Sequence, residues 1–160
     1  MQPGSGIKAV VWTILLWSIR LQFPQVKPLS TDELAEWLQT AKNPLLLDVR
    51  TPEEYRVSHL PNAQLAPTCL EELADIVTPE TLIVVYCSVG YRSAKLAQKL
   101  QQSGYKQVFN LEGSIFKWLN QGRLVYQNGK PVRQVHAYNQ FWGWFLKPSL
   151  PITETIYELD

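Results

Sequence analysis

The sequence predicts an α/β fold in which a parallel sheet carries helices on both faces. Two observations predict it. Short apolar or β-branched runs alternate with amphipathic helical segments through the middle of the chain, as is typical of parallel strands joined by crossover helices. Several of the helical segments also begin with recognisable capping residues. A hydrophobic N-terminal segment and a C-terminal hairpin with an aromatic tail flank this middle part.

The first two helices of the middle part are predicted from capping boxes. Ser30 is followed by Glu33, and Thr51 by Glu54, with Pro52 at the first helical position. In such a box the hydroxyl and the carboxylate each satisfy a backbone N–H that the helix leaves unpaired. Further helical patterns cover residues 70–77, 93–102 and 113–120.

Strands are predicted where apolar runs separate these helices. The four runs are residues 45–49, 63–66, 81–86 and 107–111. The run 81–86 (TLIVVY) is the clearest, because it is β-branched and uninterrupted. Residues 23–29, which contain Pro24 and Pro28, are predicted to be an extended linker. In a parallel sheet the ligand crevice lies beyond the carboxyl ends of the strands, and the run 81–86 delivers Cys87 there.

The N-terminal segment is apolar but short. Residues 9–19 carry no charge and lie between Lys8 and Arg20. As a helix they would span about 16 Å, against about 30 Å for the hydrocarbon core of a membrane. Three interpretations stay open: a helix docked on the domain or at a membrane interface, a cleaved signal peptide, and an artefact of an upstream start codon. No small-x-small cleavage site follows the segment.

The C-terminal part predicts a hairpin and an aromatic helix. Asn128-Gly129 is a typical hairpin turn. An apolar helical stripe is expected from the spacing of Tyr138, Phe141, Trp142 and Phe145. The favoured interpretation is an aromatic lid packed on the domain, with Trp12 and Trp17 as its partners. The alternative is a contact surface for a protein or a membrane.

Composition and cysteine content restrict the class of protein. With 15 basic and 14 acidic side chains, the chain has no surplus of charge that would favour nucleic-acid binding. Cys69 and Cys87 are the only cysteines, so neither a disulfide framework nor a zinc site is predicted. A reducing, cytoplasmic compartment is expected, with membrane association or export as the alternative. No metal or organic cofactor is implied.

Cys87 stands in a chemically informative place. A strand ends, the cysteine follows, a five-residue loop closes and a helix is predicted to begin near Ser93. The amides of such a loop and of the first helical turn form an anion nest, which would stabilise a thiolate at its centre. Gly90 would give the loop its freedom and Arg92 would support donor binding. The substrate-binding set is Ser88, Val89, Gly90, Tyr91, Arg92 and Ser93.

Two chemistries suit this site. The thiolate could take the outer sulfur of an anionic donor such as thiosulfate and pass it on from a persulfide, or it could attack a phosphate monoester. Here Arg92 follows Cys87 after four residues, one fewer than in a Cys-x5-Arg phosphatase loop. The smaller ring favours sulfur over phosphate.

The order of motifs resembles that of single-domain rhodaneses. Residues 48–55 and 58–63 resemble the first rhodanese signature, residues 87–93 the active loop, and residues 111–114 with Trp118 the second signature. The match extends over about residues 28–123. It predicts three parts: residues 1–27 as N-terminal segment and linker, 28–123 as rhodanese domain, and 124–160 as hairpin and aromatic tail.

The resemblance implies a rhodanese-like fold and sulfurtransferase activity with Cys87 as the catalytic persulfide carrier. It also implies that Asp48 and Arg50 lie near the active loop and support its shape or charge. The partners expected are a small anionic sulfur donor and a thiol, protein or cyanide acceptor, with no nucleic acid. Ser58, Asn62 and Ser114 stand where the family often has glycine; these are scaffold turns.

Other interpretations are carried beside this one. A non-catalytic rhodanese-like module that binds a partner is one, and a small-ring phosphatase or arsenate reductase is the other. His59 is expected to be structural, His136 is given no role, and Cys69 is expected to be buried at a helix start. Contact of the hydrophobic ends with a membrane or a protein is an open expectation.

Overall fold

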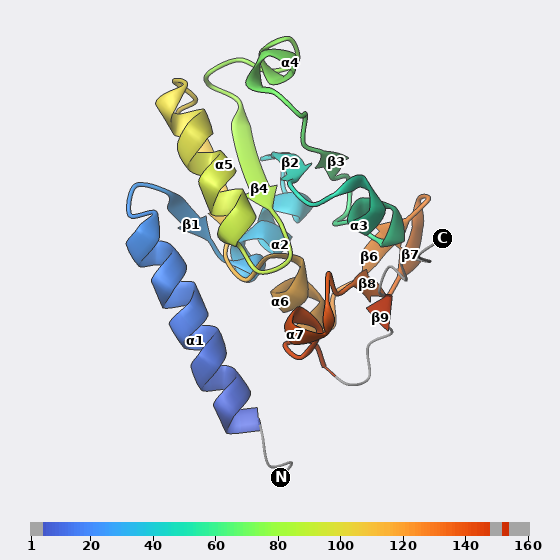
Figure 1. Cartoon of the computed structure of the whole chain (residues 1–160). Helices are drawn as coiled ribbons and strands as arrows, with labels where there is room; N and C mark the ends of the chain where they lie inside the picture. The colour runs from blue at the N-terminus through green and yellow to red at the C-terminus, as the bar shows by residue number, and fades with distance from the viewer. Residues whose placement is uncertain (1–4, 148–151, 154–160) are drawn as a thin grey trace, which may run out of the picture.

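The computed structural model describes residues 5–147 and 152–153. Its centre is a sheet of five parallel strands in the order β1-β5-β4-β2-β3 (Figure 1). The strands are β1 (Lys27–Leu29), β2 (Leu45–Asp48), β3 (Gln64–Leu65), β4 (Leu82–Tyr86) and β5 (Gln107–Leu111). The predicted α/β fold with a parallel sheet is confirmed.

Helices cover both faces of this sheet. The helices of the described part of the chain are α1 (Ser5–Gln22), α2 (Thr31–Gln39), α3 (Pro52–Val57), α4 (Leu70–Ala74), α5 (Tyr91–Gln102), α6 (Ser114–Asn120) and α7 (Gln140–Gly143). Both predicted capping boxes are present, from Ser30 with Glu33 and from Thr51 with Glu54. Residues 70–77 were predicted to be helical, but α4 ends at Ala74, so the helix is shorter than predicted.

The core is divided by the alternation of side chains along the strands. On β4, Val84 and Tyr86 belong to the cluster that includes residues of α2 and α6, whereas Ile83 and Val85 belong to the cluster of α4 and α5. All four side chains are fully buried. A strand buried on both faces appears in the sequence as a continuous apolar run, which is why the run 81–86 was the clearest strand.

The predicted linker at residues 23–29 is wrong in its last part. Lys27 pairs with Phe109 and Leu29 with Leu111, so residues 27–29 form the edge strand β1. Proline has no backbone N–H, but Pro28 is tolerated because the outer side of an edge strand forms no hydrogen bonds to another strand. β1 is short, and its pairing with a distant strand stabilises it.

The C-terminal hairpin forms as predicted. β6 (Val125–Gln127) and β7 (Lys130–Val132) pair antiparallel. Asn128 and Gly129 between them both have positive φ, 50° and 74°, as a type I′ turn requires. A further pair, β8 (Val135–His136) with β9 (Ile152–Thr153), is parallel.

The predicted aromatic helix is much shorter than its stripe. α7 contains four residues, and Tyr138 precedes it with a left-handed φ of 67°, so Tyr138 cannot belong to the helix. Phe145 is buried and Trp142 packs against the same cluster. Tyr138 and Phe141 remain exposed. The tail therefore packs on the domain as an aromatic cover, but tertiary contacts rather than helical periodicity determine its shape.

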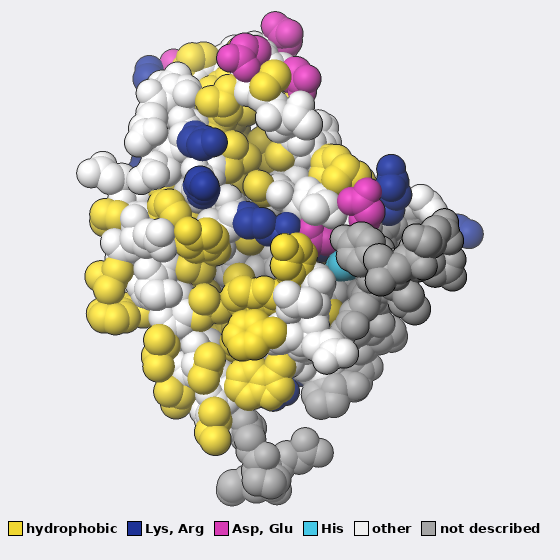
Figure 2. Space-filling model, in the orientation of Figure 1, with side chains coloured by type: hydrophobic (Ala, Val, Ile, Leu, Met, Phe, Trp, Pro, Cys, Tyr) yellow, Lys and Arg dark blue, Asp and Glu magenta, His cyan; other side chains and the backbone are white. Residues whose placement is uncertain are grey.

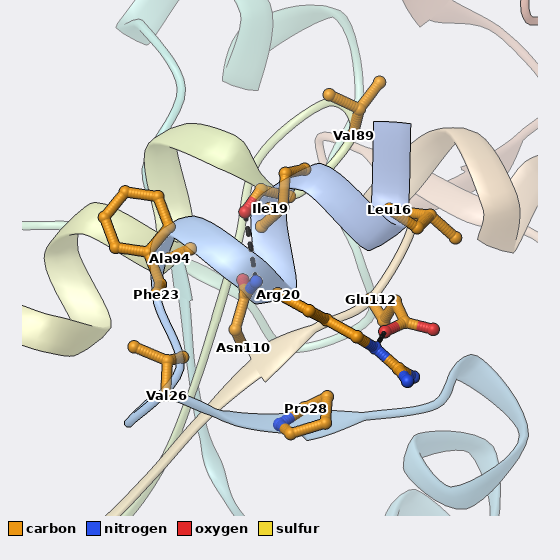
Figure 3. Close-up of a pocket in the computed structure, with 12 residues that line it drawn as sticks. Leu16, Ile19, Arg20, Phe23, Val26, Pro28, Val89, Ala94, Asn110 and Glu112 are labelled. Atoms are coloured by element: carbon orange, nitrogen blue, oxygen red, sulfur yellow. Dashed lines mark hydrogen bonds and ion pairs between the residues drawn. The ribbon is translucent and has the colours of Figure 1, made fainter. Parts of the chain in front are cut away.

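The N-terminal segment is a docked helix. The N-terminal half of α1 lies near α7, and its other end leads into β1 at the edge of the sheet (Figure 1). The rings of Trp12 and Phe145 lie 5.3 Å apart. At its other end, Ile19 packs with Ala94 of α5, and Arg20 forms an ion pair of 2.6 Å with Glu112 (Figure 3). Among the described helices, none is both long and apolar enough to cross a membrane.

The outer face of α1 is apolar and exposed. Its side chains are Ile7, Val10, Ile14, Trp17 and Leu21. Trp17 is 61% exposed, so the prediction that it packs against the aromatic tail is wrong. Figure 2 shows hydrophobic side chains gathered over the α1 and α7 end of the molecule. A contact of this end with a protein or a membrane stays a prediction.

Candidate active site

Cys87 lies where the sequence places it, at the carboxyl end of β4. The helix that follows begins at Tyr91, two residues earlier than the predicted start near Ser93. Gly90 is its N-cap residue with a φ of +118°, a backbone conformation that glycine adopts without a steric penalty. The turn between strand and helix is therefore short, and Arg92 belongs to the first turn of α5.

The sulfur of Cys87 has polar contacts on the loop side. The backbone N–H of Gly90 donates to Sγ at 3.2 Å, and the hydroxyl oxygen of Ser93 lies 3.5 Å from Sγ. The amides of Tyr91 and Arg92 open α5 and lack intrahelical acceptors. The N–H of Gly90 and the positive end of α5 therefore lie on the side of the sulfur where an anion would bind.

Asn110 on β5 supports this loop and was not identified from the sequence. Its Nδ2 donates to the carbonyl of Gly90 at 3.0 Å, and its Oδ1 accepts the hydroxyl of Ser93 at 2.6 Å. A hydroxyl has one hydrogen, so the much shorter contact to Asn110 takes it. The hydroxyl hydrogen of Ser93 therefore points to Asn110, and the hydroxyl oxygen faces Sγ. The Ser93 side chain does not cap the helix. In the sequence, Asn110 was visible only as a polar residue near the end of the predicted strand 107–111.

Glu54 is the second residue that sequence reasoning missed as part of the site. Its carboxylate is buried and accepts two hydrogen bonds from Arg92, at 2.8 and 2.9 Å. The hydroxyl of Ser88 donates to the same carboxylate at 3.3 Å. Arg92 and Ser88 therefore face Glu54 rather than the sulfur. The sequence indicated Glu54 only through its capping box.

Electrostatics support the ionised state of both partners. Burial opposes the charged form of Glu54, but the hydrogen bonds and charge of Arg92 outweigh it and lower the pKa of the carboxyl from its ordinary 4.5. Burial likewise opposes the charged form of Arg92, yet the hydrogen bond to Glu54 and the negative charges of Cys87 and Glu54 raise its pKa. The pair is a fixed clamp between α3 and α5.

A Glu54→Gln substitution should show the energetic contribution of this clamp. We expect the free energy of unfolding at pH 7 to fall by about 1–3 kcal/mol, because a charged acceptor is lost and Arg92 is 34% exposed. Since folding lowers the pKa of Glu54, its stabilisation is complete above pH 4.5 and disappears as the pH falls through the folded-state value. Urea titrations across this range should show the two proteins converging in acid. If the two proteins differed in unfolding free energy by the same amount at every pH, the stabilising role of the ionised Glu54 carboxylate would be contradicted.

Asp48 and Arg50 form a buried ion pair beneath the loop. Arg50 donates to the carboxylate from Nε and Nη2, the latter at 2.6 Å, and both side chains are inaccessible to solvent. The hydroxyl of Tyr86 donates to the same carboxylate at 2.6 Å. Burial, reinforced by the charge of Asp48, raises the pKa of Tyr86 well above 10. Because Tyr86 directly precedes Cys87, the pair positions the loop without contacting the sulfur.

The three positions at which the family often has glycine carry other residues here, and each of these residues has a structural role. Ser114 has a positive φ of 49°, and its hydroxyl accepts the backbone N–H of Cys87 at 3.1 Å. The hydroxyl of Ser58 donates to the carbonyl of Gln134, joining α3 to the C-terminal part. Asn62 adopts a φ of 59°, which asparagine tolerates better than most residues.

Two histidines and Cys69 remain to be placed. His59 stacks on Tyr55 and lies 2.9 Å from the carbonyl of Leu60, which supports the structural role. His136 is buried and accepts the N–H of Tyr138. The expectation that Cys69 is buried is wrong: it is exposed at the start of α4, because the loop before α4 lies on the surface.

A cavity of about 420 Å³ lies over Cys87. The sulfur of Cys87 has almost no contact with solvent, because the residue is only 1% exposed. It lines the cavity nevertheless, so a molecule inside could approach it. Residues of α1 and of the C-terminal part line the same cavity. Neither segment belongs to the part of the chain from which the site was predicted.

These features define a class: an α/β protein with a cysteine in a main-chain anion cradle at the carboxyl edge of a parallel sheet. A sequence model of the Rhodanese-like domain matches residues 30–121, and the chain belongs to this family. The predicted domain boundaries, residues 28–123, stay a prediction.

Named relatives share this part of the chain. The probable adenylyltransferase/sulfurtransferase MoeZ of Mycobacterium tuberculosis is 36% identical over 93 residues, 56% of this chain but only 24% of MoeZ. A sulfurtransferase of Allochromatium vinosum is 33% identical over 98 residues, 61% of this chain and 92% of that protein. The crystal structure of a rhodanese-like domain protein from Staphylococcus aureus superposes with a TM-score of 0.57 at 30% identity, covering 64% of this chain and 99% of that one.

Proposed function

We propose that the protein is a sulfurtransferase that carries sulfane sulfur as a persulfide on Cys87. The observation that supports it best is the position of Sγ, 3.2 Å from the N–H of Gly90 at the start of α5. This place suits an anionic sulfur both before and after loading. Two relatives of the same family have sulfurtransferase in their names.

The reaction has two half-steps. The Cys87 thiolate attacks the outer sulfur of a donor such as thiosulfate, the sulfur–sulfur bond of the donor breaks and sulfite leaves with the electron pair. A thiol or cyanide then takes the outer sulfur and releases the Cys87 thiolate. Such covalent catalysis separates one transfer into two displacement steps at the same sulfur.

The Arg92–Glu54 clamp argues against phosphate chemistry. A phosphatase needs an arginine free to bind two phosphate oxygens, whereas both terminal nitrogens of Arg92 are directed to Glu54 at 2.8 and 2.9 Å. In this proposal Arg92 contributes a screened positive charge and holds the loop, rather than forming a fork on the donor.

The direct test is the mass of the protein after exposure to thiosulfate. We expect intact-mass spectrometry to show the addition of one sulfur atom, assigned to the Cys87 peptide and removed by cyanide. The Cys69→Ser variant should still gain the sulfur, since Cys69 is exposed on α4. No gain at Cys87 with thiosulfate or with an organic persulfide as donor would leave a partner-binding module as the better explanation.

A further inference from the structure

The cavity over Cys87 is built largely by segments outside the family match. Six of its eleven lining residues lie beyond residues 30–121. They are Leu15, Ser18, Ile19 and Gln22 of α1, and Tyr138 and Trp142 of the C-terminal part. Figure 3 shows the adjoining side of α1, where Leu16 and Ile19 lie close to Val89 of the loop. The extensions of this chain therefore shape what can approach the sulfur.

The size of the cavity exceeds the needs of an inorganic substrate. In liquid water each molecule occupies about 30 Å³. Thiosulfate is only a few times larger than a water molecule, and cyanide is smaller than thiosulfate. The cavity of about 420 Å³ lies in the range of about 300–1,000 Å³ that holds organic ligands. Most of it would remain filled with water if only such an anion entered.

The chemistry of the walls is mainly apolar. Leu15, Ile19 and Trp142 provide aliphatic and aromatic surface. Among the described lining residues, Arg92 is the one charged side chain besides the proposed Cys87 thiolate. Its charge is paired with Glu54, and its guanidinium carbon lies 5.3 Å from the ring centre of Tyr138. A second anionic group would gain little there, whereas an apolar group would gain by leaving water.

We infer that the sulfur acceptor is a small organic thiol whose apolar body occupies this cavity; the inference rests on the proposed persulfide at Cys87. The acceptor thiol attacks the outer sulfur of the persulfide anion and gives that sulfur its proton. A new sulfur–sulfur bond forms as the bond to Sγ breaks, and the electron pair returns to Sγ as the thiolate. The proton stays on the transferred sulfur, and no oxidant or reductant is required.

The test is a series of acceptors with thiosulfate as the fixed donor: cyanide, ethanethiol, butanethiol and hexanethiol. These alkyl thiols ionise almost alike, so differences in kcat/KM report on burial of the chain. We expect kcat/KM to rise by up to about four-fold per methylene, and by at least about ten-fold from ethanethiol to hexanethiol. A flat series overturns the inference, while transfer to cyanide and loading of Cys87 leave the proposed function standing.

A matched pair of variants on α1 tests whether the preference for longer thiols arises in the cavity. Ser18 lines the cavity, whereas Thr13 is exposed on the same helix and does not. We expect Ser18→Trp to lower the hexanethiol-to-cyanide ratio of kcat/KM by at least about ten-fold. Thr13→Trp should keep the wild-type ratio. Equal ratios in the two variants would overturn the inference. Failure of Cys87 to load sulfur at all would instead refute the proposed function, and the inference with it.

Discussion

Replacing Cys87 with serine should reduce sulfur transfer from thiosulfate to cyanide to the rate of the uncatalysed reaction. The hydroxyl has nearly the size of the thiol and can keep the contact with the N–H of Gly90. It cannot form a persulfide, so the covalent route is lost entirely. By comparison with other nucleophile deletions, a loss of at least about 10³-fold is expected. Formation of thiocyanate over time measures it.

The control for this substitution is Cys69→Ser. Cys69 is exposed and precedes α4, whereas Cys87 is buried at the carboxyl end of β4. The control should keep the wild-type rate. Equal rates for Cys87→Ser and the wild type would remove the catalytic role from Cys87 altogether.

Replacing Asp48 with asparagine should cause the largest loss of stability among the substitutions considered. Arg50 would keep its positive charge in a place inaccessible to solvent, where one of its nitrogens, Nη1, already has no hydrogen-bond partner in the described part of the chain. Removing one member of a buried ion pair costs about 3–5 kcal/mol. Urea denaturation followed by circular dichroism should show this as a lower free energy of unfolding.

Two further variants separate the charge from the hydrogen bonds. Tyr86→Phe removes the hydroxyl that donates to Asp48 and accepts the N–H of Leu60, so a smaller loss of about 1–3 kcal/mol is expected. The double variant Asp48→Asn/Arg50→Met should recover much of the loss, because no unpaired charge remains. If Asp48→Asn cost less than about 1 kcal/mol, the pair would not be the main support of the loop.

Much of the fold was predictable because its signals are local. A capping box needs residues only three positions apart, and the burial of β4 on both faces appears directly in its run of apolar residues. The loop at Cys87 was predictable for the same reason, since strand, cysteine, Gly90 and helix follow one another. β1 was missed because its three residues are stabilised by pairing with β5, about eighty positions further along the chain.

The candidate site was predictable only in part. Glu54 and Arg92 are 38 positions apart, and Ser93 and Asn110 are 17 apart; neither pairing follows from any local pattern. The aromatic stripe predicted one long helix, but the left-handed conformation of Tyr138 and the packing of Phe145 shortened it. Tertiary contacts here override periodicity.

By itself, the sequence determined the parallel α/β architecture, the position of Cys87 at the end of a strand and the short turn that follows it, because neighbouring residues create each of these. Only the tertiary structure decided that Glu54 clamps Arg92, that Cys87 is covered, and that α1 and the aromatic tail form an apolar cavity above it. The physical reason is that burial and ion pairing depend on which distant segments fold against each other, and the free energy of those contacts has no signature within a single stretch of chain.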